Sequence, residues 1–277
     1  MFSSRKFRLP VLLTVVAAWA AAQDGGAAPK LSLAEQEEFL RTAKVVNMRN
    51  LSVGVTNSRR ATLDNGKLQH DAHIQTVNES KSTFAGQRRT ELNFRDSYKY
   101  NIAAYELAKI LELDMIPPSV ERRIAGQTAA VTWWVDRTAM TEGDRLKKNT
   151  PPPNVLNWNQ QMQIVRVFDQ LIFNTDRNLQ NLVITTDWQI WMIDHTRAFR
   201  MLKDLENQKN LAMCDRRLLA HLKGLSREAM QPKLSAWLTG PEMDGLLARR
   251  DAIVQFFEKQ AAAKGEGAVL YDLPPRE

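Results

Sequence analysis

Apolar residues recur at helical spacing in several long stretches of the chain. Residues 96–113 place a stripe of apolar side chains on one helix face, and two prolines follow at 117 and 118. Residues 160–173 are denser in apolar side chains, which predicts a buried helix. Ser32, followed by Glu35 and then by apolar residues, predicts a capped helix over residues 32–46. Residues 202–259 are also predicted to be mostly helical.

Two other stretches have the turn signals of β-hairpins. The first, residues 59–77, contains Asp64-Asn65-Gly66, which is a strong hairpin-turn sequence. The second, residues 182–193, turns at Thr185-Thr186-Asp187. Residues 129–135, AAVTWWV, are rich in β-branched and aromatic side chains and predict a buried strand. The polar stretch 78–89 is predicted to be a loop.

The order of these elements divides the chain into two lobes. A mixed β/α part, residues 31–136, is followed by a polar, Pro-rich connector, 137–157. A helical part with one embedded β-hairpin, 158–262, comes next, and residues 263–277 form a tail. The expected fold class is therefore α+β, with a small β-rich N-lobe and a mainly helical C-lobe.

The first 22 residues have the pattern of a secretory signal peptide. Arg5, Lys6 and Arg8 precede an apolar stretch, 10–19, that is short for a membrane span, and small residues end at Ala22. The alternatives are a buried N-terminal helix and a membrane anchor. We expect cleavage near Ala22, a Gly/Ala linker over 23–30, and export to the periplasm or the medium. No later run reaches the roughly 18 apolar residues of a membrane helix, so we expect no integral span in the mature chain.

Composition narrows the classes of function. The 277 residues are 44% hydrophobic and 25% charged, which suits a globular protein with a sizeable core. Cys214 is the single cysteine, so an internal disulfide is excluded, and with four histidines the chain is poor in ligands for structural zinc. The net charge is +7, but the basic pairs are scattered rather than gathered in one stripe, so no nucleic-acid partner is expected.

Asp176, Asn181 and Asp194 have the spacing of a phosphoryl-transfer site. Asn181 follows Asp176 by five positions, between the buried helix and the second hairpin, and Asp194 ends that hairpin. Because a hairpin returns its end close to its start, Asp194 is expected near Asn181. Asp176 would orient or deprotonate an acceptor hydroxyl, and the other two would supply hard oxygen ligands for a metal. The alternatives are helix caps, strand ends and a structural ion pair of the Asp-Arg loop.

Residues 174–181, together with Ile193-Asp194-His195, resemble the catalytic region of atypical kinases. This group includes the HipA-type toxin kinases, the phosphoinositide lipid kinases and the secretory-pathway kinases, and the chain looks most similar to bacterial, exported relatives of them. Residues 97–107 resemble the N-lobe helix of the same group, and the resemblance covers about residues 54–199. It implies a protein-kinase-like fold, ATP with Mg²⁺ or Mn²⁺ as cofactors, and a hinge over 132–136 beside the adenine. Trp133 or Trp134 would flank the adenine there, and the alternative is that both are core aromatics.

The N-lobe departs from the kinase pattern at two positions. Kinases carry a lysine on the returning strand for the α- and β-phosphates, and Gln75 stands there in this chain. The glutamate that pairs with that lysine corresponds to Asn101, with Glu106 as the alternative. Glutamine donates hydrogen bonds but has no charge to offer a phosphate. Three lysines remain as substitutes: Lys67, Lys81 and Lys99.

The sequence therefore supports two functions. One is an exported ATP-dependent phosphotransferase with Asp176 as base, Asn181 and Asp194 as metal ligands, and an unknown phosphoryl acceptor. The other is a pseudokinase, a ligand- or protein-binding module without turnover, which Gln75 and Asn101 favour. Protein, sugar, lipid and small-molecule acceptors all remain open.

Overall fold

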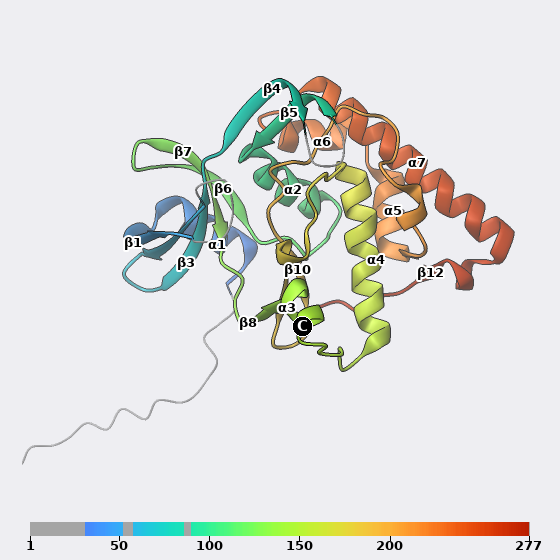
Figure 1. The fold of residues 1–277 in the computed structure, drawn as a ribbon, viewed down its shortest axis with the longest axis horizontal. Helices are drawn as coiled ribbons and strands as arrows, with labels where there is room; N and C mark the ends of the chain where they lie inside the picture. Colours follow the sequence, from blue (N-terminus) through green and yellow to red (C-terminus); the bar gives the residue numbers. More distant parts are fainter. Residues whose placement is uncertain (1–30, 52–57, 86–89, 277) are drawn as a thin grey trace, which may run out of the picture. The chain divides into compact units, whose positions relative to one another are not determined.

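A five-stranded antiparallel sheet organises the first half of the chain in the computed structural model, which describes residues 31–51, 58–85 and 90–276. The strand order is β1 (Lys44–Asn50), β2 (Arg59–Asp64), β3 (Gln69–Gln75), β7 (Gln127–Trp133) and β6 (Ser119–Ile124) (Figure 1). Strands β2 and β3 are joined by the predicted turn, in which Gly66 has a φ of 84° and donates its N–H to Asp64 Oδ1. Glycine takes this left-handed conformation without steric cost, so the turn follows from the local sequence.

Two helices pack against this sheet. Helix α1 (Leu33–Thr42) and helix α2 (Lys99–Ile110) both contact β6 and β7. Ser32 and Glu35 form the predicted capping box of α1. Helix α2 is buried on most of its surface and also contacts the second half of the chain, because its side chains are apolar almost all round. It therefore links the sheet to the helical half.

An antiparallel pair of strands, β4 (Asn78–Ala85) and β5 (Thr90–Ser97), is inserted between β3 and α2. The prediction of a loop is wrong for residues 78–85. Almost every side chain of β4 is exposed, so the strand lacks the apolar alternation by which strands are recognised. Strand β5 differs, since Phe94 and Asp96 are 2% and 3% exposed. The inserted hairpin thus presents β5 side chains to the rest of the molecule.

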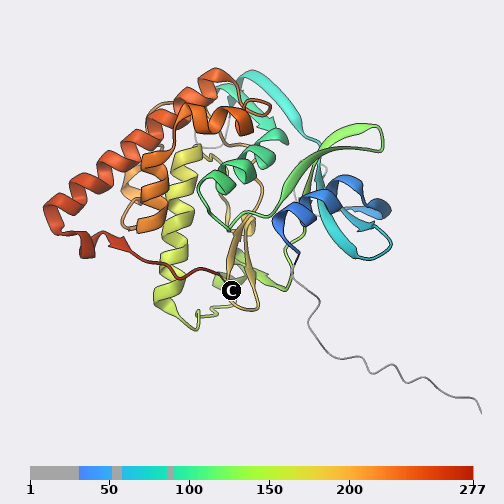
Figure 2. The ribbon, with the colours of Figure 1, turned by 180° about the vertical axis from the view of Figure 1, so that it is seen from behind.

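The second half of the chain is mainly helical and is centred on α4 (Val155–Ile172). Helix α7 (Gly240–Lys264) packs along α4 and α5 (Arg216–Gly224), as the view from behind shows (Figure 2). Helix α6 (Arg227–Leu234) packs against α2. The remaining elements are short: α3 (Glu142–Lys147), the parallel pair β11 (Cys214–Asp215) and β12 (Leu270–Tyr271), and the 3-10 turns η1 (Leu179–Asn181), η2 (Gln208–Asn210) and η3 (Glu266–Ala268).

The predicted second hairpin is present as β9 (Leu182–Thr185) and β10 (Ile190–Met192). It is joined by a third strand, β8 (Thr138–Thr141), in the order β10-β9-β8. Strand β8 and helix α3 both lie in the stretch 137–157, which the sequence indicated only as a polar connector. Thr141 and Asp144 form a capping box at the start of α3, so the sequence did contain a signal for this helix.

The arrangement confirms the α+β class, with a β-rich first half and a mainly helical second half that contains a hairpin. Across the described ranges, no helix combines the length and apolar character needed to cross a membrane. The predicted signal peptide, residues 1–22, and the linker, 23–30, lie outside the described residues.

Candidate active site

The loop that follows α4 is fixed by its first residues. Phe173 ends the helix in a left-handed conformation with a φ of 50°. Asn174 is 4% exposed, donates from Nδ2 to Asp169 Oδ1 at 3.1 Å, and accepts at Oδ1 from the N–H of Asp176 at 3.1 Å. Contacts back to α4 therefore set the direction of the chain at Asp176.

Arg177 joins three elements through one guanidinium group. Its Nε lies 2.9 Å from Asp169 Oδ2 and its Nη2 lies 3.0 Å from Asp169 Oδ1, which is a two-pronged contact with α4. Its Nη1 donates to the carbonyls of Asn181 at 3.0 Å and Ile193 at 2.8 Å. The structural ion pair considered from the sequence is thus made by Arg177 with Asp169, and Arg177 holds the loop to the hairpin.

Asp176 presents the accessible carboxylate of this loop, with a side chain that is 46% exposed. Partial burial raises the pKa of Asp176 above its ordinary value, the positive charge of Arg197 opposes this, and the charges of Asp194 and Asp96 raise it further. A carboxylate that reaches solvent and has a raised proton affinity is suited to accept a proton from a hydroxyl.

Asn181 and Asp194 lie at the two ends of the β9–β10 hairpin. The N–H of Ile193 donates to the carbonyl of Asn181 at 3.0 Å, so the hairpin returns Asp194 to the neighbourhood of Asn181 as expected. Asp194 has a φ of 53°, an uncommon conformation for a residue other than glycine. Thr196 Oγ1 donates to Asp194 Oδ1 at 3.1 Å and orients the carboxylate. Backbone strain of this kind occurs preferentially at functional sites.

The oxygen atoms of Asn181 and Asp194 fit a divalent cation of the Mg²⁺ type. Nδ2 of Asn181 faces the carbonyl of Asp176 at 3.5 Å, which directs its amide oxygen away from that carbonyl. Mg²⁺ commonly takes one or two protein carboxylates and completes its shell with waters and phosphates. Among the described residues, no three His, Cys, Asp or Glu side chains form a metal-binding group. An ion held by this pair would therefore need further oxygen ligands from its substrate.

Asn101 and His73 approach Asp194 from the first half of the chain. Oδ1 of Asn101 accepts a hydrogen bond from the N–H of His195 at 2.7 Å. Asn101, which the kinase pattern compared with a glutamate, thus holds the residue next to Asp194. Burial lowers the pKa of His73 on β3, and the charge of Asp194 opposes that shift, so His73 lies within electrostatic reach of Asp194.

Arg197 and Asp96 belong to the same cluster and were missed from the sequence. Nε of Arg197 donates to Asp96 Oδ2 at 2.8 Å, and its Nη1 lies 3.5 Å from Asp176 Oδ2. Burial lowers the pKa of Arg197, but the hydrogen bond and charge of Asp96 and the charges of Asp176 and Asp194 raise it above its usual value. Asp96 was predicted to begin the helix over residues 96–113 but lies on β5, so nothing in the pattern linked it to the site.

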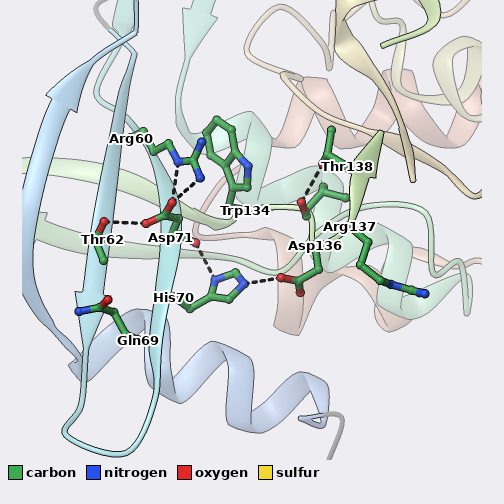
Figure 3. A pocket seen from close by; sticks show the side chains of 10 residues that line it. Arg60, Thr62, Gln69, His70, Asp71, Trp134, Asp136, Arg137 and Thr138 are labelled. Carbon is green, nitrogen blue, oxygen red and sulfur yellow. Dashed lines mark hydrogen bonds and ion pairs between the residues drawn. The ribbon is translucent and has the colours of Figure 1, made fainter. Parts of the chain in front are cut away.

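An open pocket of about 720 Å³ lies between the β2–β3 hairpin and residues 134–138 (Figure 3). The guanidinium carbon of Arg60 lies 4.1 Å from the ring centroid of Trp134, and its Nε donates to Asp71 at 2.6 Å. Across the pocket, His70 Nε2 lies 2.7 Å from Asp136 Oδ1. Asp176, Asn181 and Asp194 do not line this pocket. Strand β3 connects the pocket to Asp194. Asp71 lines the pocket, and His73 lies two positions further along the same strand face, about 7 Å from Asp71.

Gln75 and Glu106, the other two candidates, are engaged with their own neighbours. Gln75 is fully buried, donates to Ser58 Oγ at 3.1 Å and accepts from the N–H of Thr76 at 3.1 Å. Glu106 pairs with Lys109 of the same helix at 3.0 Å. The structure therefore places Trp134 in the open pocket, gathers Asp176, Asn181 and Asp194 at the loop, and leaves Glu106 in a separate ion pair.

The fold is similar to those of a solved Fam20 protein and of a solved Golgi casein kinase. A hydra Fam20 structure, solved with sugar, aligns with a TM-score of 0.68 and 14% identity over 87% of this chain and 92% of that chain. A Golgi casein kinase aligns with a TM-score of 0.61 and 13% identity over 88% of this chain and 80% of that chain. It has also been solved with Mn and ADP bound. No protein-family model and no curated protein sequence matches the chain. The chain therefore has an atypical protein-kinase-like fold, which confirms the predicted resemblance at the level of the fold.

Proposed function

We propose that this chain, with its atypical kinase-like fold, is a metal-dependent phosphotransferase that uses ATP. Asp176 is the general base that accepts a proton, and Asn181 and Asp194 hold Mg²⁺ or Mn²⁺. Trp134 flanks the adenine of the nucleotide. The observation that carries the proposal is the joint placement of Asp176, Asn181 and Asp194. One arginine, Arg177, ties their loop and hairpin together, and the charge of Asp194 acts on Asp176.

Each residue has a defined part in the transfer. Asp176 takes the proton of the acceptor hydroxyl while the hydroxyl oxygen bonds to the γ-phosphorus and the bond from that phosphorus to the bridging oxygen breaks, which leaves ADP. Asn181 and Asp194 place the divalent ion, which supplies neutralisation of the phosphate charge. The open pocket beside Trp134 receives the adenine, Asp71 of β3 lines that pocket, and His73 lies two positions further along the strand.

A pseudokinase is the second candidate, and one observation favours it. Gln75 and Asn101 stand where kinases carry a charged pair, and each is already hydrogen-bonded, to Ser58 and to His195. A binding module of this kind would hold nucleotide or another ligand without turnover.

Thermal shift tests the binding of nucleotide, on which the proposed transfer depends. Purified protein is heated with ATP, with and without Mn²⁺, beside Asp194→Asn and the control Asp187→Asn. Asp187 is a carboxylate at the opposite end of the same hairpin, where it pairs with Arg137 at 2.8 Å. We expect a metal-dependent stabilisation that Asp194→Asn loses and Asp187→Asn keeps. Absence of any nucleotide effect in the unmodified protein would refute the proposal.

Turnover is then tested with radiolabelled ATP and a screen of protein, sugar, lipid and small-molecule acceptors. We expect metal-dependent transfer that Asp176→Asn reduces by 10²-fold or more, as removal of a general base does. Metal-dependent binding without transfer to any acceptor or to water would favour the pseudokinase.

We also propose that residues 1–22 act as a signal peptide and that the enzyme works outside the cytoplasm. Expression of the full chain followed by N-terminal sequencing of the exported protein tests this directly. A mature N-terminus near Gln23 is expected, and retention of Met1 in an internal protein would contradict it.

A further inference from the structure

Phosphate binding requires positive charge, and strand β3 offers little. Gln75 is an uncharged amide and is fully buried. The strand has the sequence QHDAHIQ, which contains neither lysine nor arginine. Of the three lysines considered from the sequence, Lys81 pairs with Glu79 at 2.9 Å, Lys67 is exposed in the β2–β3 turn, and Lys99 is the first residue of α2. The cation must therefore come from another element.

Three arginines surround the catalytic loop, and two of them have their donors occupied. Arg177 donates to Asp169, to Asn181 and to Ile193, and its side chain is 12% exposed. Arg200 donates to Glu91, to the carbonyl of Arg95 and to Thr175, and its side chain is 8% exposed. These two guanidinium groups hold the fold and have little capacity for a ligand.

Arg197 differs from both. Within the described part of the chain its guanidinium makes one hydrogen bond, from Nε to Asp96, although a guanidinium has five N–H donors. Its Nη1 lies 3.5 Å from Asp176, an ion-pair distance that is long for a hydrogen bond, and its side chain is 27% exposed. The two terminal nitrogens thus face the candidate base and solvent with donors to spare.

Asp96 and Phe94 hold this side chain from β5. Asp96 is 3% exposed and uses Oδ2 for Arg197, while the ring centroid of Phe94 lies 5.6 Å from the guanidinium carbon. A guanidinium fixed at Nε keeps its Nη1 and Nη2 edge in one orientation, which matches two oxygens of a phosphate. The inserted β4–β5 hairpin thus positions the arginine.

We infer that Arg197 binds a phosphate group of the nucleotide beside Asp176 and supplies the positive charge that β3 lacks. The inference rests on the proposed function and deepens it. Arg197 forms and breaks no covalent bond in the transfer; it donates hydrogen bonds to phosphate oxygens. Three carboxylates, those of Asp96, Asp176 and Asp194, surround this single cation, so phosphate binding also requires the divalent ion at Asp194 to offset their charge.

Equilibrium binding tests the inference without relying on turnover. Calorimetry compares ATP, adenosine and inorganic tripolyphosphate, each with Mn²⁺, on the unmodified protein, Arg197→Met, Arg197→Lys and Arg216→Met. Arg216 of α5 is the matched control. It is a partly exposed arginine that lies 2.6 Å from Glu266 and 3.5 Å from Asp272. We expect Arg197→Met to weaken ATP and tripolyphosphate about 10- to 100-fold, the effect of charged hydrogen bonds, and to leave adenosine unchanged. Arg197→Lys should recover part of the loss, and Arg216→Met should bind normally.

The outcomes separate this inference from the proposed function. Unchanged binding of ATP and tripolyphosphate by Arg197→Met refutes the role of Arg197 alone, as does an equal loss of adenosine. Tripolyphosphate binding that depends on Arg197, without any binding of ATP, upholds Arg197 and refutes the ATP site. Binding of neither anion by the unmodified protein refutes both.

A chemical test covers the case in which Arg197→Met fails to fold. Phenylglyoxal modifies accessible arginines, and peptide mass spectrometry reports each site in the unmodified protein. Tripolyphosphate with Mn²⁺ should shield Arg197 at least several-fold and leave Arg216 as reactive as before. Equal modification of Arg197 with and without the anion would overturn the inference.

Discussion

Asn101 of α2 and His195 are 94 positions apart, and the side-chain oxygen of the first accepts the backbone N–H of the second at 2.7 Å. Asn101 is 6% exposed and His195 is 2% exposed, so water has little access to replace this bond. His195 directly follows Asp194, and the bond therefore fixes the chain at the candidate metal ligand. It also ties a helix that packs on the five-stranded sheet directly to the segment that follows the β9–β10 hairpin.

Asn101→Leu should destabilise the protein and loosen the metal site. The variant has similar volume but leaves the buried N–H of His195 without its acceptor, which costs about 1–3 kcal/mol. Urea unfolding measures the free energy of unfolding, and Mn²⁺ titration measures metal affinity. Asn50→Leu, at an exposed position on β1, is the control and should stay within about 0.5 kcal/mol of the unmodified protein. Equal stability of the two variants would show that the hydrogen bond contributes little.

Transfer activity should fall as the pH is lowered through the pKa of Asp176. The base must be ionised, and partial burial raises its pKa above the ordinary 3.8. The dependence of kcat/KM on pH measures this, because it reports groups of the free enzyme. Arg197→Lys keeps the positive charge, so the acidic limb of the kcat/KM profile, where activity falls with pH, should stay close to its position in the unmodified protein. In Arg197→Met the limb should move to higher pH, since Arg197 lowers the pKa of Asp176. A limb that stays in place in both variants would contradict this electrostatic coupling.

The metal-free protein should lose stability as the pH falls below about 6.5, partly through His195. Burial, together with the charge of Arg177, holds the pKa of His195 well below 6.5, so the folded state keeps it neutral while the unfolded chain takes up a proton. The contribution of neutral His195 to the free energy of unfolding is fully present above the pKa of histidine in the unfolded chain. Below that pKa it declines by up to about 1.4 kcal/mol per pH unit.

His195→Phe isolates this effect because it removes one titrating group and leaves the carboxylates and His73 in place. Phenylalanine would pack on Phe168, whose ring centroid lies 6.1 Å from that of His195. Urea unfolding at several pH values should give a shallower acid decline for the variant. Parallel declines would show that His195 is protonated in the folded protein.

Gly245→Ala should destabilise the protein by about 1–3 kcal/mol, as overpacking does. A Cβ at this position of α7 would lie 3.0 Å from both the carbonyl oxygen of Arg200 and the carbonyl carbon of Met201, and backbone atoms cannot turn aside. Gly224→Ala is the matched control, because nothing lies within 4 Å of its added Cβ and alanine favours a helix. Thermal unfolding of both variants measures the difference. A loss in Gly245→Ala no larger than in the control would contradict the close contact.

Local signals explain what the sequence predicted well. The Asp64-Asn65-Gly66 turn and the Ser32 capping box are encoded by adjacent residues, so the turn and the start of the helix were predicted correctly. The end of the helix was wrong, because residues 44–46 of the predicted helix belong to strand β1. The Asp176–Asn181 spacing depends on one short loop, and the hairpin placed Asp194 beside it. Strand β4 has no buried alternation, and no local pattern identifies it.

The missed part of the site depends on contacts between distant segments. Arg197 meets Asp96 across 101 positions, and Asn101 meets His195 across 94. Single-sequence periodicity carries no information about such pairs, and the kinase pattern offered a different partner for Asn101. Because the side chains of β4 are exposed, the sequence did not predict the β4–β5 hairpin, which brings Asp96 to the loop. It therefore indicated no function for Arg197.

Asp176 and its neighbour Arg177 are adjacent in the chain, but the fold depends on their side chains to different degrees. Among the described residues, the half-exposed carboxylate of Asp176 has only a long ion pair with Arg197, at 3.5 Å. The guanidinium of Arg177, in contrast, binds a helix, a loop and a hairpin together. A lineage that abandoned catalysis would be free to replace Asp176 within a few substitutions while still being selected to retain Arg177. Retention of both residues among descendants of a common ancestor would therefore record selection for chemistry, and retention of Arg177 alone would record selection for folding.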